Sequence, residues 1–429
     1  MELVILMLFC LAIILCVILN ISLVYGLLIG LFIFCAYGRH KGFAWREIGT
    51  MLWSGFLTAK NIVIIFFFIG VLTALWRASG TISVIICYSL GLIKPQLIVL
   101  MAFLLNCLIS MLLGSSFATS ATMGVISMTL GNAMGANPAL LGGAILSGIY
   151  VGDRTSPIST SALLTSVLTE TNIYDNIKKM VRTALWPFLL SCCLYGVVSF
   201  FLAGSGKVLD LAAVFSREMV LHWSAILPAL IIIILACFRV QVKLTMGVSI
   251  IAAGILCNVL QHMDILHILQ ICLTGYHAHD KEVAALLNGG GIVSMLNVAA
   301  IIAISSSYAG IFEGTGLLNN VQAFLENLSK RITPFGGIIV ASFFTAMVTC
   351  NQTLSTMLTH QLCHKLEPDQ ATFAISLEDS VIVIAPLIPW NIACAVPLTN
   401  ISAPNSSIAF AFFLYLLPLF TFIRKLHKQ

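Results

Sequence analysis

Residues 148–161 read GIYVGDRTSPISTS, and this stretch decides the class of protein to which the chain belongs. Asp153 and Arg154 follow 58 residues without any Asp, Glu, Lys or Arg, and they directly precede Ser156-Pro157 and further hydroxyls. A charge at bilayer depth costs several kcal/mol, so it usually faces a partner, a cavity or a substrate. The stretch therefore predicts a Pro-broken helix that carries a carboxylate inside a membrane. An Asp in a surface loop is the alternative.

The composition supports a membrane protein. Of the 429 residues, 60% are apolar and 9% are charged, whereas about 25% of the residues in soluble domains are charged. No charged residue lies between Glu2 and Arg39 or between Asp379 and Arg424, and a helix needs about 20 apolar residues to cross a bilayer. We therefore expect an all-α, polytopic protein embedded in a lipid bilayer. The net charge of +5 then reflects topology and does not indicate nucleic-acid binding.

The apolar segments are of two kinds, continuous and interrupted. Residues 3–37 are expected to form a helical hairpin, followed by a basic loop with Arg39, Lys41 and Arg46. Irregular backbone at membrane depth is tolerated only where protein or water covers it, and transporters build binding sites from such breaks. Continuous spans are expected at about 61–79, 96–113, 183–203, 223–238, 244–258, 284–312, 334–349 and 404–423. Gly, Pro, Ser, Thr and Asn interrupt the segments 114–131, 139–168, 350–366 and 371–400.

Lys and Arg predict the orientation, because they accumulate in cytoplasmic loops. Placing every basic cluster in the cytoplasm agrees with the number of spans and puts both termini there. The span 61–79 then runs outward and the span 284–312 runs inward. Besides the loop after the hairpin, the clusters are Lys178-Lys179 with Arg182, Arg239 with Lys243, Lys330-Arg331, and Arg424-Lys425 with Lys428.

A weak internal repeat relates the two halves of the chain. The matching spans run in opposite directions, so we expect two inverted repeats that contain broken or re-entrant helices; coincidence in a Gly/Ser-rich membrane chain is the alternative. A shift of 236 residues places Trp76–Gly80 on Phe312–Gly316, Ser115-Ser116 on Asn351-Gln352 and Thr119 on Ser355. When a gap of a few residues is allowed, Ser156–Ile158 falls near Ala385–Leu387. The expected units are 1–60 (hairpin and basic loop), 61–182 (first repeat), 183–283 (connecting helices) and 284–429 (second repeat and C-terminal helix).

The polar groups around each first-half break are candidate ligands for a cation. A broken helix frees carbonyl groups, and these can replace the water shell of a cation together with hydroxyls and a carboxylate. Packing of small residues between helices is the alternative for the first break. The candidates are Ser115, Ser116, Thr119, Asp153, Thr155, Ser156, Ser159 and Thr160, with Ser161 in the same hydroxyl run.

Two adjacent carboxylates are the most distinctive candidates in the second half. Neighbouring residues on a helix point about 100° apart, so one of Glu378 and Asp379 is expected to face a cavity while the other caps or pairs. A buried carboxylate can exchange a proton. A salt-bridged pair at the cytoplasmic end of a helix is the alternative. The second-half candidates are Asn351, Gln352, Glu378, Asp379 and Asn391.

The chain shows no enzyme or nucleotide-binding signature. Gly289–Gly291 precedes a membrane span and not a soluble βαβ unit, so a phosphate-binding loop is not expected. His360 and His364 have the i, i+4 spacing of metal ligands, but Cys363 is the sole further ligand type beside them. We expect a secondary transporter driven by an ion gradient, with no cofactor and no bound metal. A channel or scaffold without coupled transport is the alternative from another class.

Several segments resemble the NhaC family of sodium/proton antiporters over roughly residues 60–400. The resemblance implies an antiporter that moves Na+ in one direction and H+ in the other, in a bacterial cytoplasmic membrane. Some relatives exchange organic acids, so a carrier of a small organic acid or amino acid is the alternative. The resemblance rests on Ile82–Pro95, Leu113–Phe117, Gly148–Ser159, Gly291–Leu296, Gly310–Gly316, Asn351-Gln352, and Leu377–Asp379 leading into Pro386–Asn391.

The chain departs from the family pattern where that pattern carries charge or polarity. Arg154 replaces the usual Lys, Thr160 the usual Asp, and Ile375 the usual Arg, while Val381-Ile382 replaces a Gly-Thr pair. The affinity of a hard cation depends partly on the charge of its ligands. The resemblance therefore predicts weaker sodium binding than in an ordinary member, and a gain from Thr160→Asp. The sequence is compatible with a monomer and with a homo-oligomer.

Overall fold

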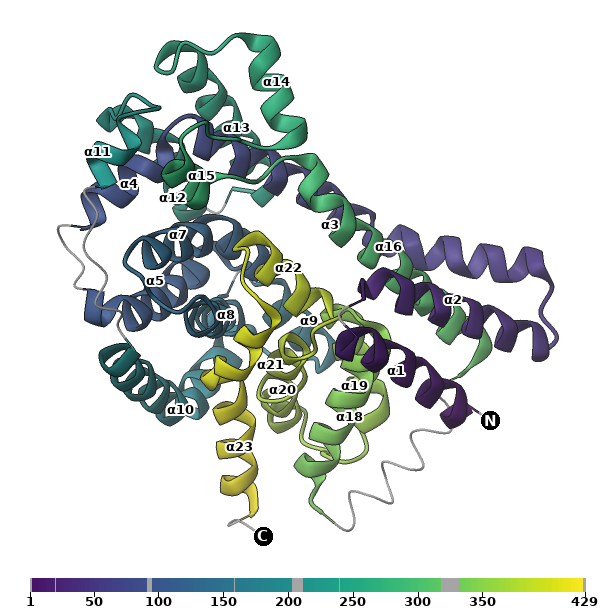
Figure 1. Cartoon of the computed structure of the whole chain (residues 1–429). Helices are drawn as coiled ribbons and strands as arrows, with labels where there is room; N and C mark the ends of the chain where they lie inside the picture. The colour runs from purple at the N-terminus through teal and green to yellow at the C-terminus, as the bar shows by residue number, and fades with distance from the viewer. Residues whose placement is uncertain are drawn as a thin grey trace.

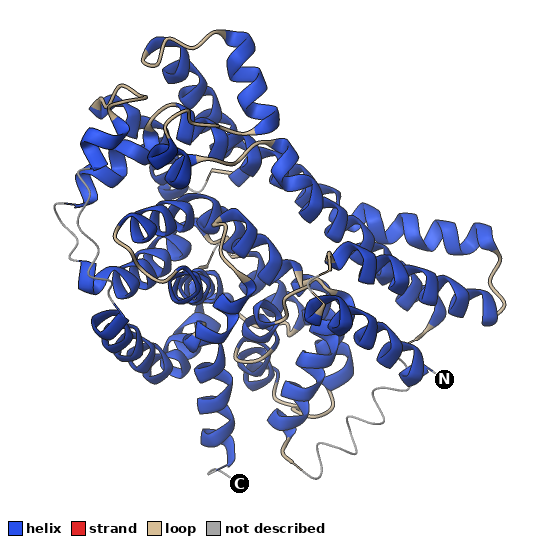
Figure 2. Ribbon diagram, in the orientation of Figure 1, coloured by secondary structure: helices blue, strands red, loops and turns tan. Residues whose placement is uncertain are grey.

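The computed structural model describes residues 2–19, 21–90, 95–157, 159–202, 211–238, 240–317 and 332–426. Within these ranges the chain is built of helices, and its one pairing of extended backbone is an isolated bridge between Tyr276 and Gly289 (Figure 2). The prediction of an all-α protein is confirmed.

Few helices of the described part are long enough to cross a membrane unaided. Ile173–Phe200, Ile292–Phe312 and Gln370–Leu387 are long and apolar enough, and Val63–Ala78 with Thr81–Tyr88 makes a fourth span that bends by 62°. The remaining apolar helices contain 10–17 residues, fewer than the about 20 that a perpendicular span needs. Short and broken helices therefore make up much of the membrane-embedded part.

Two long helices organise the molecule. α3 (Trp45–Ala78) and α16 (Ile292–Thr315) pack against each other along a diagonal (Figure 1). At one end of this diagonal, α2 (Leu23–His40) packs on α16 and forms the predicted hairpin with α1 (Glu2–Ile18). The other end carries α4 (Thr81–Leu90), α11 (Leu211–Phe215), η3 (Trp223–Ile226), α12 (Leu227–Cys237), α13 (Val242–Val259), α14 (Ile265–Thr274) and α15 (Lys281–Leu287).

The broken helices form a separate body beside this diagonal (Figure 1). Helices from the two halves of the chain alternate within it, so each half contributes to its centre. Its first-half elements are η1 (Pro95–Leu97), α5 (Ile98–Leu113), α6 (Ser116–Thr119), the π-helical turn η2 (Ser120–Gly124), α7 (Val125–Ala133), α8 (Pro138–Thr155), α9 (Thr160–Leu168) and α10 (Ile173–Leu202). Its second-half elements are α18 (Pro334–Thr349), α19 (Gln352–Cys363), α20 (Gln370–Glu378), α21 (Val381–Ile384), η4 (Ala385–Leu387), α22 (Ile392–Asn400), η5 (Asn405–Phe410) and α23 (Phe412–Leu426).

The contact between α3 and α16 shows that the two halves are inverted. A Cβ placed on Gly55 would lie 2.4 Å from the carbonyl oxygen of Ser306, and one on Gly70 would lie 2.6 Å from that of Gly291. The shift of 236 residues relates Gly55 to Gly291 and Gly70 to Ser306. The contact of Gly55 with Ser306 is therefore equivalent to the contact of Gly291 with Gly70, as a two-fold axis requires. α3 and α16 therefore run antiparallel as equivalent helices, which defines an inverted repeat.

The first break of each half obeys the same shift. α5 and α18 both have 16 residues, and the shift that carries Ile98 to Pro334 also carries Leu113 to Thr349. Each helix ends on a residue in the left-handed conformation, Gly114 with φ 61° and Cys350 with φ 55°. The predicted repeat is confirmed here residue by residue.

The second break follows a shift of 232 residues. α8 has 18 residues and matches the 18 residues of Gln370–Leu387, and α9 and α22 both have nine. This shift places Pro157 on Pro389. The predicted match of Ser156–Ile158 with Ala385–Leu387 is therefore three residues out of register, because the helix of the second half continues through Pro386 to Leu387 before the chain breaks.

Several predicted spans differ from the observed helices. α10 begins at Ile173 and not near residue 183, and the continuous span expected at 404–423 is divided between η5 and α23. The span expected at 61–79 belongs to α3, which begins at Trp45, so Arg46 of the expected basic loop is helical. The expected boundary between units at residue 60 therefore falls inside α3, and the one at residue 182 falls inside α10. The span expected at 284–312 is interrupted between α15 and α16, because Gly289, Gly290 and Gly291 all have positive φ. This turn lies against α3, where Arg77 donates from Nη1 to the carbonyl oxygen of Asn288 at 2.9 Å.

The helix that carries Asp153 packs closely on α5 through small residues. A Cβ on Gly148 would lie 2.6 Å from the carbonyl oxygen of Phe103, and one on Gly152 would lie 2.3 Å from the Cβ of Ser110. The Ser110 hydroxyl donates to the carbonyl oxygen of Ile149. Small residues allow such close approach between membrane helices, and the contact fixes the position of the last turn of α8.

We expect Gly148→Ala to destabilise the folded protein by about 1–3 kcal/mol, because the added methyl group meets backbone atoms that cannot move independently. The measurement is the apparent Tm of the detergent-solubilised protein. Gly196→Ala is the matched control, since its Cβ would meet a side-chain atom of Leu100 at 3.8 Å. Equal Tm values for the two variants would contradict the close packing of α5 on α8.

Candidate functional site

Asp153 lies in the last turn of α8, and its side chain is buried with 2% of its surface exposed. The chain turns back after Thr155, so the start of α9 faces the carboxylate. Ser159 donates from its hydroxyl to Oδ1 at 3.0 Å, and Ser161 donates to Oδ2 at 3.1 Å. The Ser159 and Ser161 hydroxyls are themselves 2.8 Å apart. Hydrogen bonds from hydroxyls stabilise a buried carboxylate, so the break and the carboxylate form one polar site.

The first break of the same half reaches this site through Ser116. Ser116 interacts with the Asp153 carboxylate and with the Tyr150 hydroxyl. Ser115 caps α6 by accepting from the backbone N–H of Ala118 at 3.3 Å, and Thr119 donates to the carbonyl oxygen of Ser115 at 2.9 Å. Of the three candidates at this break, Ser116 faces Asp153, and the other two hold the shape of the break.

Three candidates of the hydroxyl run are not hydrogen-bonded to Asp153 among the described residues. Thr155 donates to the carbonyl oxygen of Val151 at 2.7 Å, within its own helix. Ser156 is buried and its hydroxyl has no hydrogen-bond partner among the described residues. Thr160 is exposed on the same face of α9 as Leu163 and Val167.

The structure therefore corrects the placement of Thr160 beside the cation ligands. Of these two neighbours, Ser161 is the residue whose side chain bonds Asp153, and it was not among the ligands expected from the sequence. No sequence signal separates the two hydroxyls, because the residue at which α9 begins after the Ser159 cap decides which of them faces Asp153.

The amide candidates of the second half hold broken backbone in place. Asn351 caps α19, and Asn391 caps α22. Gln352 donates from Nε2 to the carbonyl oxygen of Ile382 at 2.9 Å, and Asn391 donates from Nδ2 to that of Ala346 at 2.9 Å. These carbonyls lie beside the breaks, where the helix ladder leaves them free. In the described part of the chain, none of the three amides is hydrogen-bonded to Asp153.

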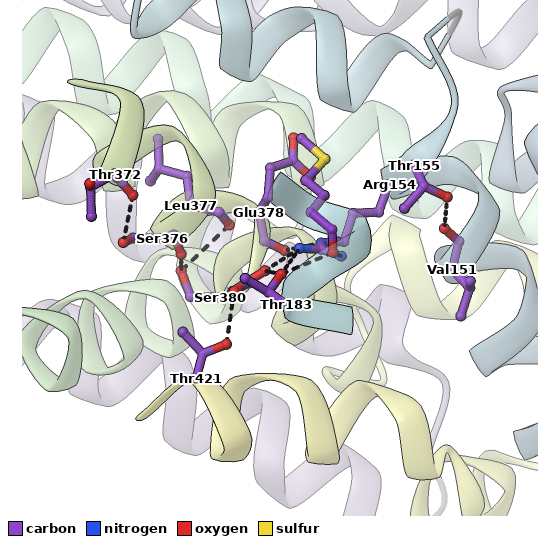
Figure 3. A network of polar contacts seen from close by, with 12 residues as sticks. Val151, Arg154, Thr155, Thr183, Thr372, Ser376, Leu377, Glu378, Ser380 and Thr421 are labelled. Atoms are coloured by element: carbon purple, nitrogen blue, oxygen red, sulfur yellow. Dashed lines mark hydrogen bonds and ion pairs between the residues drawn. The ribbon is translucent and has the colours of Figure 1, made fainter. Parts of the chain in front are cut away.

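The two adjacent carboxylates have different surroundings. Asp379 is fully buried and forms an ion pair with the Nη2 atom of Arg154. Its Oδ2 accepts from Thr421 at 2.8 Å and its Oδ1 accepts from Thr183 at 3.1 Å (Figure 3). Asp379 is therefore held in place by one buried cation and two hydroxyls.

The remaining donors of Arg154 also bond groups at this junction, where the two halves of the chain meet. Its Nε donates to the carbonyl oxygen of Glu378 at 3.2 Å, its Nη1 to that of Met180 at 3.2 Å, and its Nη2 to the hydroxyl of Thr183 at 2.9 Å (Figure 3). α8 and α10 of the first half are thus joined to α20 and α23 of the second half. Removing one partner from a buried pair leaves an uncompensated charge, which costs about 3–5 kcal/mol.

Glu378 is fully buried, and neither of its carboxylate oxygens accepts a hydrogen bond within the described residues. Among its neighbours, the charge of Arg154 acts on its carboxyl most strongly, followed by the hydroxyl of Thr165 and the carboxyl groups of Asp153 and Asp379. The Thr165 hydroxyl, however, donates its own proton to the carbonyl oxygen of Ser161 at 3.1 Å. A lone carboxylate without hydrogen bonds is too costly to keep charged in such a place. Glu378 therefore needs either a proton or a neighbouring cation.

Direct hydrogen bonds between the halves surround these carboxyl groups. The Tyr150 hydroxyl donates to the carbonyl oxygen of Ala393 at 2.6 Å, and Asn400 donates from Nδ2 to the Ser120 hydroxyl at 2.9 Å. Asp153 and Glu378 thus lie where α8 and α9 of the first half meet α20 and α22 of the second half. Among the described residues, no group of three or more His, Cys, Asp or Glu side chains is arranged to hold a metal ion.

The comparisons with known proteins agree with this architecture. The model of the Na+/H+ antiporter family matches residues 1–167 and 148–425. The chain is 28% identical over 404 residues to the Na+/H+ antiporter NhaC of Bacillus subtilis (strain 168), covering 89% of this chain and 87% of that protein.

Two further relatives carry the names of organic-substrate exchangers. The malate-2H+/Na+-lactate antiporter of Bacillus subtilis (strain 168) is 26% identical, covering 87% of this chain and 82% of that protein. The arginine/ornithine antiporter ArcD of Halobacterium salinarum (strain ATCC 700922 / JCM 11081 / NRC-1) is 26% identical, covering 82% of this chain and 75% of that protein. Because the family model spans nearly the whole sequence, the chain belongs to the Na+/H+ antiporter family, as a divergent relative of NhaC.

Proposed function

We propose that the chain is a secondary active antiporter that exchanges Na+ for H+ through Asp153 and Glu378. The observation that carries the proposal is a pair of buried carboxyl groups where the two halves meet, one bonded by hydroxyls and the other without a hydrogen bond among the described residues. Two neighbouring carboxyl groups in a dry site cannot both stay charged unless a cation joins them. Sodium and protons therefore compete for the same pair.

Asp153 is the main sodium ligand in this proposal. The hydroxyl oxygens of Ser159, Ser161 and Ser116 and the carbonyls freed by the break complete an oxygen shell of the kind that hard cations prefer. When sodium leaves, a proton neutralises the pair, and Glu378 is the group that carries it. Binding of either ion at the junction between the halves is then coupled to the rearrangement that opens the site alternately to the two sides.

Exchange of a small organic acid or amino acid is the second candidate, and the names of two relatives support it. The buried cation beside Asp153 and Glu378, Arg154, is already paired with Asp379. An organic anion would have to displace that pair. For this reason we place cation/proton exchange first.

We propose that the protein lies in a bacterial cytoplasmic membrane with both termini in the cytoplasm. The basic start of α10 and the basic end of α23 line one cavity, through Arg182 and Arg424. These ends therefore lie on the same side of the membrane, and the excess of Lys and Arg favours the cytoplasmic side.

We expect Asp153→Asn to abolish sodium-dependent proton flux in proteoliposomes while leaving the yield of folded protein unchanged. An amide keeps the shape but cannot supply the negative charge that a dehydrated cation needs. The control is Asp175→Asn, because Asp175 is exposed and pairs only loosely with Lys178 at 3.5 Å. Near-normal flux through the Asp153 variant would remove its assigned role.

Glu378→Gln and Asp379→Asn are expected to separate proton binding from folding. Glu378→Gln should keep the Tm close to that of the native chain, since no hydrogen bond among the described residues is lost, but should weaken the dependence of sodium binding on pH between about pH 5 and 9, because the proton carrier is gone while Asp153 remains. Asp379→Asn should instead lower stability by about 3–5 kcal/mol, because Arg154 is left unpaired. Tm values and sodium-binding isotherms over this pH range test both expectations, and the reverse pattern would exchange the two roles.

Substitutions at residues 160 and 161 should differ in their effect on sodium-dependent flux. Ser161→Ala should raise the sodium concentration for half-maximal flux roughly tenfold, because a polar partner of the cation-binding carboxylate is lost. Thr160→Asp should change it little, because Thr160 is exposed on the face of α9 that turns away from Asp153. A strong gain from Thr160→Asp would reinstate the expectation drawn from the sequence alone.

A further inference from the structure

A basic cavity of about 340 Å³ lies where three helix ends meet, away from Asp153. It is formed by the start of α10, the start of α20 and the end of α23. Four basic side chains line it together with two hydroxyls: Lys179, Arg182, Thr183, Thr372, Arg424 and Lys425.

Within the part of the chain that the structure describes, two of the four cations have no ion-pair partner. Lys425 forms an ion pair with Glu367 and also donates to the Ser376 hydroxyl at 2.7 Å. Lys179 interacts electrostatically with Asp369. Arg182 and Arg424 form no ion pair among the described residues. The cavity therefore carries uncompensated positive charge and is suited to an anionic group.

An apolar groove of about 390 Å³ adjoins the same end of α23. It runs between α18, η4 and α23, and its walls include Gly336, Phe343, Leu387, Pro418, Leu419 and Phe422. A Cβ on Gly336 would lie 3.1 Å from the Phe422 ring, so the two helices are close at this point.

Lys425 lies beside both the cavity and the groove. Its side chain lines the cavity, and its ammonium group lies 5.0 Å from the centre of the Phe335 ring, whose chain neighbour Gly336 lines the groove. An apolar groove beside a group of cations matches the two parts of a phospholipid.

We propose that this surface binds one anionic phospholipid, with the phosphate of its headgroup at Arg182 and Arg424 and an acyl chain in the groove. Basic side chains at the ends of membrane helices attract the anionic headgroups of lipids. A soluble anion would use the cavity alone and would leave the groove unexplained.

The site also touches the junction between the halves. Thr183 lines the cavity, and its hydroxyl bonds both Asp379 and Arg154. A headgroup bound there holds α10, α20 and α23 together at the buried ion pair. Anionic lipid should therefore stabilise the protein whatever ion it transports.

The test compares purified protein in micelles supplemented with phosphatidylglycerol, with phosphatidylcholine, or with inorganic phosphate alone. Phosphatidylglycerol should raise the Tm of the native chain, and the double variant Arg182→Gln/Arg424→Gln should need roughly tenfold more of this lipid for the same shift. Lys178→Gln is the control for charge, because Lys178 lies on the same helix and pairs with Asp175 outside the cavity. Leu419→Trp should fill the groove and weaken the lipid effect, whereas Leu189→Trp, on an exposed face of α10 outside both the groove and the cavity, should not.

Three results would overturn the proposal. Equal stabilisation by both lipids would show that binding does not depend on the charge of the headgroup. Stabilisation by inorganic phosphate alone would identify a site for a soluble anion. An unchanged lipid effect in Leu419→Trp, with the double variant impaired, would show that the groove is empty. The Tm of each variant without lipid serves to confirm that it folds.

Discussion

The structure depends on one constraint: each helix that restarts inside the protein must have its first N–H groups satisfied without bulk water. Ser115 and Asn351 cap the first restart of each half, and Ser159 and Asn391 cap the second. Uncapped helix starts would leave unpaired donors at a cost of several kcal/mol each in lipid. The four caps lie at equivalent positions of the two halves, so a single solution to this constraint is used twice.

The same breaks create the site. Because α8 ends at Thr155 and α9 restarts under the Ser159 cap, two hydroxyls converge on Asp153 at the junction with the second half. The buried pair of Arg154 and Asp379 holds that junction together and leaves Glu378 as the carboxyl group without a fixed partner. A structural ion pair and a free carboxyl group in adjacent residues allow the halves to stay joined while the charge at the site changes.

Much of the fold could be predicted from the sequence, because charge-free runs and Pro, Gly and Ser breaks depend on local composition. The bounds of α18 follow those expected, and the shift between the halves holds to the residue over α5 and α18. The interruption before α16 was missed, since three glycines in an apolar run are compatible with a continuous span until their positive φ values are known. Thr160 and Ser161 could not be distinguished, because the residue at which α9 begins decides which of the two faces Asp153. Likewise, the role of Asp379 depends on Arg154, Thr183 and Thr421, which only the folded chain brings together.

Competition between sodium and a proton for one pair of carboxyl groups is the central claim. It is tested most directly by titrating the purified protein with sodium in two buffers of different ionisation enthalpy and counting the protons released. We predict the release of about one proton for each sodium bound near neutral pH, since the pair of Asp153 and Glu378 can hold either ion but not both. Sodium binding without any proton release would contradict the claim.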